Sequence, residues 1–184
     1  MKTKTVSELM VPLSEYATVS EEATLYDAIL ALEKAQEEVE HWDYKHRAIL
    51  VYNRENKIVG KVSQLDVLRS LEPKYDDLSD SNFGTTSGLS QNFIRSMINQ
   101  YKLWDLPMRD ICSKAARLKV RSFMYTPSDG ELVEENASLD EAVHQLVMGH
   151  HQSLLVTRRT DIIGILKLTD VFKEICQQIK SCHI

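Results

Sequence analysis

The fold of this chain is indicated by two related stretches, GKVSQLDVLRSL at Gly60–Leu71 and GILKLTDVFKEI at Gly164–Ile175. In each stretch a glycine stands within an aliphatic run that is typical of a β-strand, and an aspartate follows it within an apolar pattern of helical spacing. Each stretch therefore predicts a strand that leads directly into a helix. Asp66 and Asp170 occupy the same place in this strand-to-helix corner.

The similarity extends outwards from the two corners. Residues 6–10 (VSELM) align with residues 120–124 (VRSFM), and AILVY at 48–52 aligns with SLLVT at 153–157. The first copy is longer, through the charged stretch EKAQEEVEHWDYK, but the order of the matched segments is the same on both sides of it. The chain therefore contains an internal repeat.

Both copies have the same succession of patterns. A short extended segment (ATV or ELV) precedes a capping pattern (TLYD or SLDE), then a helical apolar stripe, two aliphatic runs separated by a polar turn, and the closing helix. This order predicts an α/β (α+β) fold of two pseudo-symmetric β-α-β-β-α units. Since each sheet needs cover, we expect the units to pack sheet to sheet and to leave a cleft at their seam.

These patterns divide the chain into a first repeat at 1–71, an insert at 72–119 and a second repeat with a C-terminal helix at 120–184. In the insert, the turn-forming composition of 79–90 predicts flexibility, and 91–105 predicts an amphipathic helix. The apolar stripe of this helix is expected to pack on the protein's own core or on a dimer mate; it comprises Ile94, Met97, Ile98, Tyr101 and Trp104.

Composition argues against several classes of protein. The net charge of −5 and the lack of a basic run disfavour nucleic-acid binding, and no apolar stretch has the ~20 residues that span a bilayer. Glu8 interrupts the basic start of the chain before a signal-length apolar run. Three cysteines without a C-x-x-C pair indicate a reducing, cytoplasmic setting.

No catalytic or metal-binding pattern was found. His144, His150 and His151 are close in sequence but lack an acidic or cysteine partner at ligand spacing, so we interpret them as surface residues. The chain has no Gly-rich phosphate loop and no pattern of a nucleophile with its base. We therefore expect neither an enzyme nor a metal site.

The repeated order of a capped helix, an aliphatic strand and a G-h-h-x-x-x-D corner resembles the CBS domain, the cystathionine β-synthase motif, which usually occurs as a tandem pair called a Bateman module. The resemblance covers residues 6–71 and 120–175. It implies a regulatory module that binds AMP, ADP, ATP or S-adenosylmethionine between the repeats and forms homodimers. It implies no cofactor, and a further effector protein could be the partner that reads the signal.

The resemblance also implies ligand-binding residues. The family pattern G-h-h-[S/T]-x-x-D is kept at Gly60, Ser63 and Asp66, whereas the second repeat has Lys167 before Asp170. The aspartate would accept hydrogen bonds from ribose hydroxyls, and the helix start would suit a phosphate. The other implied ligand-binding residues are Arg47, before the first repeat's aliphatic strand, and Thr18 and Val19 in its extended segment. On this basis the first repeat is the better half-site and the second is degenerate.

Each of these assignments has an alternative. Ser63 and Asp66 also form a helix-capping pattern that needs no ligand. Arg47 is either a phosphate clamp or an ion-pair partner of Glu38 or Glu40, and Lys167 either replaces the hydroxyl or fills the pocket. The leading hypothesis is an adenine-nucleotide sensor. The alternative is a ligand-free dimerisation scaffold whose insert helix docks a target protein.

Overall fold

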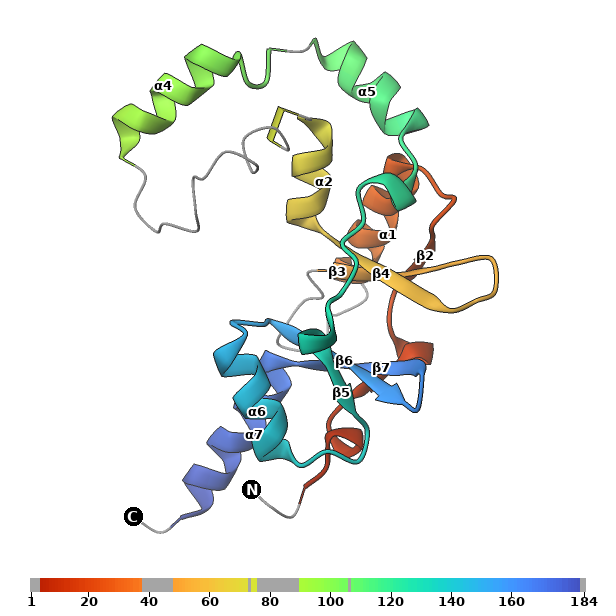
Figure 1. The fold of residues 1–184 in the computed structure, drawn as a ribbon, viewed down its shortest axis with the longest axis vertical. Coiled ribbons are helices and arrows are strands. Elements are labelled where there is room, and N and C mark those ends of the chain that lie inside the picture. The colour runs from red at the N-terminus through yellow and green to blue at the C-terminus, as the bar shows by residue number, and fades with distance from the viewer. Residues whose placement is uncertain (1–3, 38–47, 73, 76–89, 106, 183–184) are drawn as a thin grey trace.

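The computed structural model describes residues 4–37, 48–72, 74–75, 90–105 and 107–182 (Figure 1). Its first repeat contains the strands β2 (Thr18–Ser20), β3 (Ala48–Tyr52) and β4 (Ile58–Ser63) and the helices α1 (Leu25–Glu37) and α2 (Gln64–Leu71). Its second contains the strands β5 (Leu132–Glu134), β6 (Ser153–Arg158) and β7 (Asp161–Lys167) and the helices α6 (Leu139–Met148) and α7 (Leu168–Ser181). The predicted β-α-β-β-α order is therefore confirmed in both copies.

The two sheets have equivalent pairing. β2 runs parallel to β3, which is antiparallel to β4, and β5 runs parallel to β6, which is antiparallel to β7. The short strand β1 (Val11–Pro12) adds to the outer edge of β7, so the second sheet has the order β1-β7-β6-β5.

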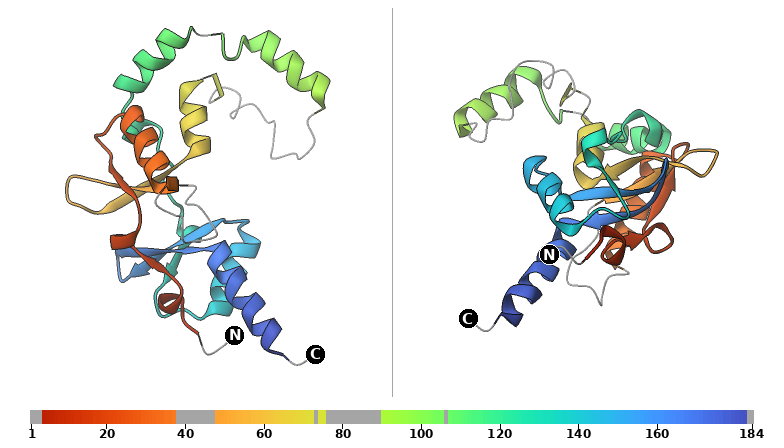
Figure 2. Two further views of the ribbon diagram at one scale, coloured as in Figure 1. Left: turned by 180° about the vertical axis from the view of Figure 1, so that it is seen from behind. Right: turned by 60° about the horizontal axis from the view of Figure 1, so that its bottom comes forward.

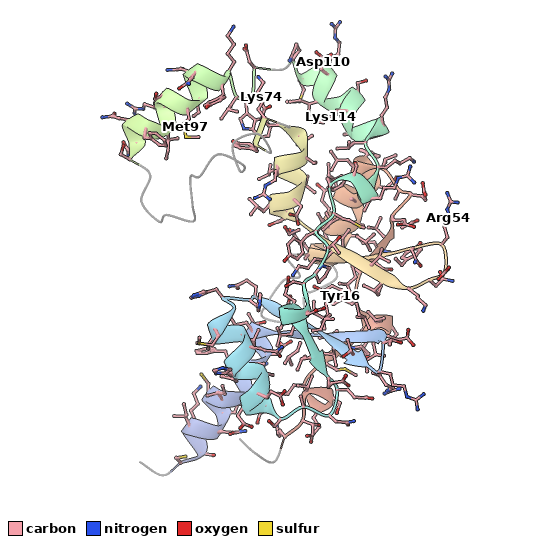
Figure 3. All side chains as sticks on the ribbon, in the orientation of Figure 1. Tyr16, Arg54, Lys74, Met97, Asp110 and Lys114 are labelled. Carbon is pink, nitrogen blue, oxygen red and sulfur yellow. The ribbon has the colours of Figure 1, made fainter. Side chains whose placement is uncertain are left out.

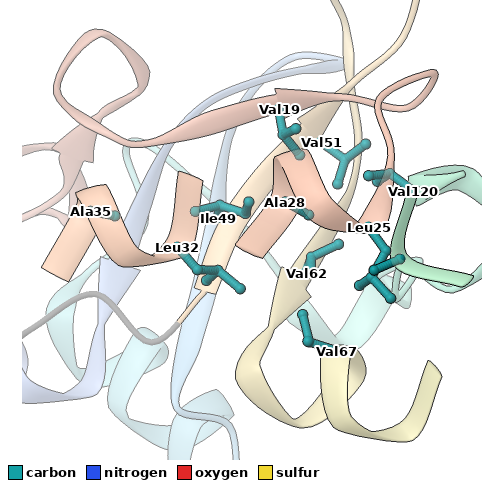
Figure 4. Close-up of a cluster of buried hydrophobic side chains, with 11 residues drawn as sticks. Val19, Leu25, Ala28, Leu32, Ala35, Ile49, Val51, Val62, Val67 and Val120 are labelled. Atoms are coloured by element: carbon teal, nitrogen blue, oxygen red, sulfur yellow. The ribbon is translucent and has the colours of Figure 1, made fainter. Parts of the chain in front are cut away.

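Alternation along the central strands divides the apolar residues between two faces of each sheet. In β3, Ile49 and Val51 face α1 and α2 and are fully buried in the core of the first repeat (Figure 4). In β6, Leu154 and Val156 have the same role beneath α6 and α7. Each repeat thus has its own helix-covered core.

The opposite faces of the two sheets pack against each other. Leu50 of β3 and Leu155 of β6 lie in one buried cluster with Tyr16 and Ile165. Leu50 is 0% exposed and Leu155 is 2% exposed. The expected packing of sheet against sheet is therefore confirmed, and aliphatic side chains at matched positions form its centre.

The segment that leads into each repeat packs on the other repeat. Val6 is fully buried in the core of the second repeat, where its N–H donates to the carbonyl of Ala137 at 3.0 Å. Val120 is fully buried in the core of the first repeat, where its N–H donates to the carbonyl of Ala23 at 2.9 Å. The repeats are therefore interlocked by a reciprocal exchange, which the aligned sequences did not predict.

The glycine of each corner lies where the exchanged segment crosses. A Cβ on Gly60 would lie 2.9 Å from the carbonyl oxygen of Tyr125, and one on Gly164 would lie 2.7 Å from that of Val11. Both distances are too short for a real side-chain contact, so the close approach of two backbones requires glycine at both positions.

The insert carries two helices, α4 (Gln91–Tyr101) and α5 (Met108–Arg117). The helix expected at 91–105 is therefore present as α4, whereas no pattern in the sequence analysis indicated α5. Figures 1 and 2 show α4 extending away from both repeats, while α5 lies beside α1 and α2 and buries Ala115 in the first core. The segment expected to be flexible, 79–90, lies outside the described residues except for Ser90.

The stripe on the insert helix is not buried in the protein's own core. Ile94, Ile98, Tyr101 and Trp104 are between 36% and 44% exposed. Of the two expectations for this surface, packing on the protein's own core is therefore wrong for these four residues. Cover by a dimer mate stays a prediction.

Candidate functional site

At the first corner, Ser63 and Asp66 form a complete capping box. The Asp66 carboxylate accepts from the N–H of Ser63 at 2.8 Å and from its hydroxyl at 2.6 Å, and the N–H of Asp66 donates back to Ser63 Oγ at 3.3 Å. These bonds satisfy donors at the start of α2 that would otherwise lack partners. The capping interpretation is thus confirmed for this pair, and one carboxylate oxygen, Oδ2, makes the bonds.

The second corner has the same backbone but a different interaction. Lys167 stands at the N-cap of α7 and makes no side-chain capping bond. Its ammonium instead lies 3.2 Å from Asp170 Oδ2, and the two side chains are only 14% and 20% exposed. A half-buried ion pair therefore replaces the capping box of the first corner.

A cavity of about 580 Å³ opens beside this ion pair. Residues at the start of α7, residues 8–17 around β1 and Ala35 of α1 line it. The lining residues are Glu8, Leu9, Met10, Val11, Pro12, Glu15, Ala17, Ala35, Lys167, Asp170, Lys173, Glu174 and Gln177. The volume lies within the range of small-molecule sites, and both repeats contribute to its walls.

The chemistry of this lining is mixed. An apolar wall of Met10, Val11 and Ala17 could cover a planar ring, while Asp170 offers carboxylate oxygens at the start of a helix. The charged residues of the lining are four acids, Glu8, Glu15, Asp170 and Glu174, and two lysines, Lys167 and Lys173. The lining therefore combines apolar side chains with charged ones of both signs.

Tyr16 links this site to the interface between the sheets. The residue is 8% exposed and belongs to the buried cluster that contains Leu50 and Leu155. It lies between the two repeats (Figure 3). Burial, with a smaller contribution from the Asp170 carboxylate, raises the pKa of Tyr16 to about 12. The phenol therefore stays protonated to a higher pH than that of an exposed tyrosine.

The remaining residues implied by the resemblance lie at different places. Thr18 is exposed, and Val19 is 7% exposed within the first core; Ala17, just before them, is the residue that lines the cavity. Arg47 lies outside the described residues. Its counterpart Gln152 does lie at the second corner, where its carbonyl accepts the N–H of Leu168 at 3.0 Å.

The sequence did not identify the wall that comes from residues 8–17. Those residues precede the first repeat's core elements, and only the exchange brings them against α7 of the second repeat. The matching of VSELM with VRSFM showed that the segment is repeated. It contained no signal for which repeat the segment contacts.

The architecture of two interlocked units with equivalent corners agrees with a comparison to protein families. A model of the CBS domain matches residues 6–73 and again residues 120–177. The chain belongs to the CBS domain family. The resemblance deduced from the two corners is thereby confirmed as a tandem CBS pair.

Several solved structures have the same fold. A CBS domain-containing protein of unknown function from Bacillus anthracis aligns with a TM-score of 0.63 and 17% identity, over 96% of each chain. CBSX2 in complex with AMP aligns with a TM-score of 0.57 and 19% identity, over 96% of this chain and 98% of that one.

The CBS domain of a bacterial CNNM/CorC family Mg²⁺ transporter in complex with ATP aligns with a TM-score of 0.57 and 18% identity, over 95% of this chain and 89% of that one. A search of curated proteins found none that matches this sequence. At these identities the likeness concerns the fold of the CBS pair.

The described residues contain neither a membrane-spanning helix nor a metal-binding cluster. No helix among them is long and apolar enough to cross a membrane. Within the same residues, no group of three or more His, Cys, Asp or Glu is arranged to hold a metal ion.

Proposed function

We propose that this CBS pair is a regulatory module that binds an adenosine-containing ligand in the cavity at the second corner. The observation that carries the proposal is the cavity itself, whose lining includes Asp170 at the start of α7 together with the apolar residues Met10, Val11 and Ala17. CBS domains are generally regulatory modules rather than enzymes, and two structures of the same fold hold AMP or ATP.

The cavity suits the parts of such a ligand. A ribose presents two neighbouring hydroxyls, and Asp170 can accept from both, while the apolar wall can cover the adenine ring. For Asp170 to bind the ribose, the Lys167 ammonium must turn from Asp170 towards the ligand. The ion pair between Lys167 and Asp170 is then replaced by interactions of both side chains with the ligand. Since both repeats line the cavity, a ligand that fits one arrangement of the repeats better would favour that arrangement.

The test compares matched variants of the two corners. AMP, ADP, ATP and S-adenosylmethionine are screened by thermal shift against the wild type, Asp170→Ala and Asp66→Ala. Ligand at 100 times its Kd should add roughly 2.7 kcal/mol of stability to the wild type. We expect the shift to disappear in Asp170→Ala and to persist in Asp66→Ala. A shift that is lost only in Asp66→Ala would show that the ligand binds at the first corner. No shift in the folded wild type would contradict the proposal of a nucleotide sensor.

We also propose that the module is a homodimer. Leu68 of α2 and Phe172 of α7 hold equivalent positions in the repeats and are 52% and 60% exposed. Such side chains on matched helices are typical of a surface covered by a second copy. Light scattering should show a dimer that is dissociated by Leu68→Glu, whereas Gln64→Glu on the same helix should leave it intact. A monomeric wild type would contradict the proposal.

A second function is favoured by the exposed stripe of α4. Ile94 and Ile98 are 43% and 44% exposed, and their helix extends away from both repeats (Figure 2). A ligand-free scaffold would use this face to dock an effector protein. The two functions differ in one measurement, because only the sensor gives a nucleotide-dependent melting shift. A cytoplasmic location belongs to either proposal.

A further inference from the structure

The two corners of the pair differ in the side chains that stand at matched positions near the aspartate. Three positions near the second corner carry Val11, Ala17 and Ile165, and Val11 and Ala17 line the open cavity. The corresponding positions near the first corner are occupied by larger and polar side chains; these are Tyr125, Glu131 and Lys61.

The correspondence of these positions rests on the register of the backbone. Val11 is paired antiparallel with Ile165, beside the contact of the exchanged segment with Gly164. Tyr125 is paired in the same way with Lys61, beside the contact with Gly60, and their backbones exchange two hydrogen bonds of 2.9 Å. The same geometry therefore brings different side chains to the two corners.

At the first corner these side chains form a closed set of interactions, which we call the Lys61–Glu131–Tyr125 cluster. The Lys61 ammonium pairs with one carboxylate oxygen of Glu131, and the Tyr125 hydroxyl donates to the other. The same ammonium lies 4.8 Å from the centre of the Tyr125 ring. Glu131 is only 2% exposed, so the cluster is anchored inside the protein.

The cluster lies close to the carboxylate that the first corner would offer to a ligand. The hydrogen bond to Glu131, with smaller contributions that include the charge of Asp66, raises the pKa of Tyr125. Asp66 itself is already engaged with Ser63 in the capping box. Among the described residues of the first corner, Asp66 thus bonds through Oδ2 to Ser63, and Lys61, Glu131 and Tyr125 bond to one another.

We infer that the Lys61–Glu131–Tyr125 cluster closes the first corner as a latent site for the same class of adenosine ligand, so that each chain takes one ligand, at the second corner. This inference rests on the proposed function for the identity of the ligand. Lys61, Tyr125 and Glu131 are then the residues that determine which of two equivalent corners is used.

The test transfers the residues of the open corner to the closed one. The triple variant Lys61→Ile, Tyr125→Val and Glu131→Ala removes both charges of the ion pair together, so it leaves neither charge unpaired. AMP binding to the wild type and to the triple variant is measured by calorimetry. Two further proteins add Asp66→Ala or Asp170→Ala to the triple variant. Tyr125→Val alone, which keeps the ion pair, replaces the triple variant if that does not fold.

We expect one AMP per wild-type chain and two per chain of the triple variant. Adding Asp66→Ala should return the value to one by removing the new site, and adding Asp170→Ala should return it to one by removing the original site. Two AMP molecules on the wild type, or one on a folded triple variant, would overturn the inference.

A ligand-free readout separates this inference from the proposed function. If the wild type binds no AMP, the proposed function fails, and crystal structures of the wild type and the variant decide the inference alone. A new cavity beside Asp66 in the variant supports closure by the cluster. A first corner that is open in the wild type, or still filled in the variant, overturns it.

Discussion

The carbonyl oxygen of Val11 lies so close to Gly164 that a Cβ on this glycine would be 2.7 Å from it. The same relationship joins Tyr125 to Gly60, where the distance would be 2.9 Å. The glycine in each corner is thus explained by the exchange of segments between the repeats, and the aspartate that follows it starts a helix in both.

Gly164→Ala is expected to destabilise the protein by about 1–3 kcal/mol, the cost of forcing a methyl group into a well-packed contact. The matched control is Gly130→Ala, because a Cβ there would meet only Ser128 Oγ at 3.9 Å. Urea denaturation of the three proteins measures the difference. Equal midpoints for the two variants would show that the crossing segment moves aside at little cost.

Ser63→Ala should reduce the free energy of unfolding by about 1 kcal/mol, since it removes the capping acceptor of α2. Gln64→Ala, at the exposed first residue of the same helix, should change it by less than about 0.5 kcal/mol. Thermal and urea denaturation compare the two. A Ser63→Ala variant as stable as the wild type would indicate that the cap contributes nothing there.

Glu72 anchors the insert to the end of α2. Its side chain accepts the N–H of Trp104 at 2.6 Å, and the residue is 1% exposed. Glu72→Ala leaves this N–H without its partner, which costs about 1–3 kcal/mol locally, whereas Glu72→Gln keeps an acceptor oxygen. Hydrogen exchange at the Trp104 amide should therefore accelerate strongly in the first variant and weakly in the second. Unchanged exchange in Glu72→Ala would contradict the anchor.

Ionisation of Tyr16 is expected to make the free energy of unfolding depend on pH in the alkaline range. Its pKa in the folded state is raised, mainly by burial, from 10.0 to about 12. A raised pKa means that its contribution is fully present below pH 10 and is lost as the pH rises through about 12. Tyr16→Phe should therefore lose less stability than the wild type when the pH is raised above 10. Parallel urea denaturation curves test this, and identical pH slopes would contradict it.

The charges that line the cavity predict a preference among adenosine ligands. With four acids and two lysines in the lining, a triphosphate is repelled more than a cationic ligand. We expect S-adenosylmethionine to bind at least roughly tenfold more tightly than ATP, which is about 1.4 kcal/mol. Calorimetry with both ligands measures the ratio, and tighter binding of ATP would contradict it.

A variant isolates the contribution of one lining charge. Glu15→Gln removes an acid from the lining and should strengthen ATP binding. Glu55→Gln, in the exposed turn before β4, should have no effect because it is not part of the cavity. Equal ATP affinities for the two variants would show that the lining charge does not select the ligand.

Much of the fold could be predicted because it depends on local patterns. The aliphatic runs AILVY and SLLVT predicted the two central strands, and both strands are present as β3 and β6. The expected packing of sheet against sheet is also observed, with Leu50 and Leu155 buried between the sheets. Two ordered copies of the same corner were enough to indicate the CBS family. The capping interaction of Ser63 with Asp66 could also be predicted, since a capping box lies within four consecutive residues.

The site was less predictable, because it is assembled from distant segments. The sequence pattern favoured the first corner on the identity of Ser63, but the cavity lies at the second, where Lys167 stands. Whether a corner is open depends on the side chains that the exchanged segment brings to it. Those side chains depend on which repeat the exchanged segment contacts. The residue types within one corner do not indicate which repeat this is.

The sequence by itself thus determined the two β-α-β-β-α units and the family, since hydrophobic periodicity and capping act between neighbours along the chain. Only the tertiary structure decided why glycine is required at 60 and 164, and which corner has room for a ligand. Both depend on the reciprocal crossing of residues 4–12 and 118–125, which buries Val6 in the core of the second repeat and Val120 in the core of the first. Burial of such long-range contacts is set by the whole fold and not by any local pattern.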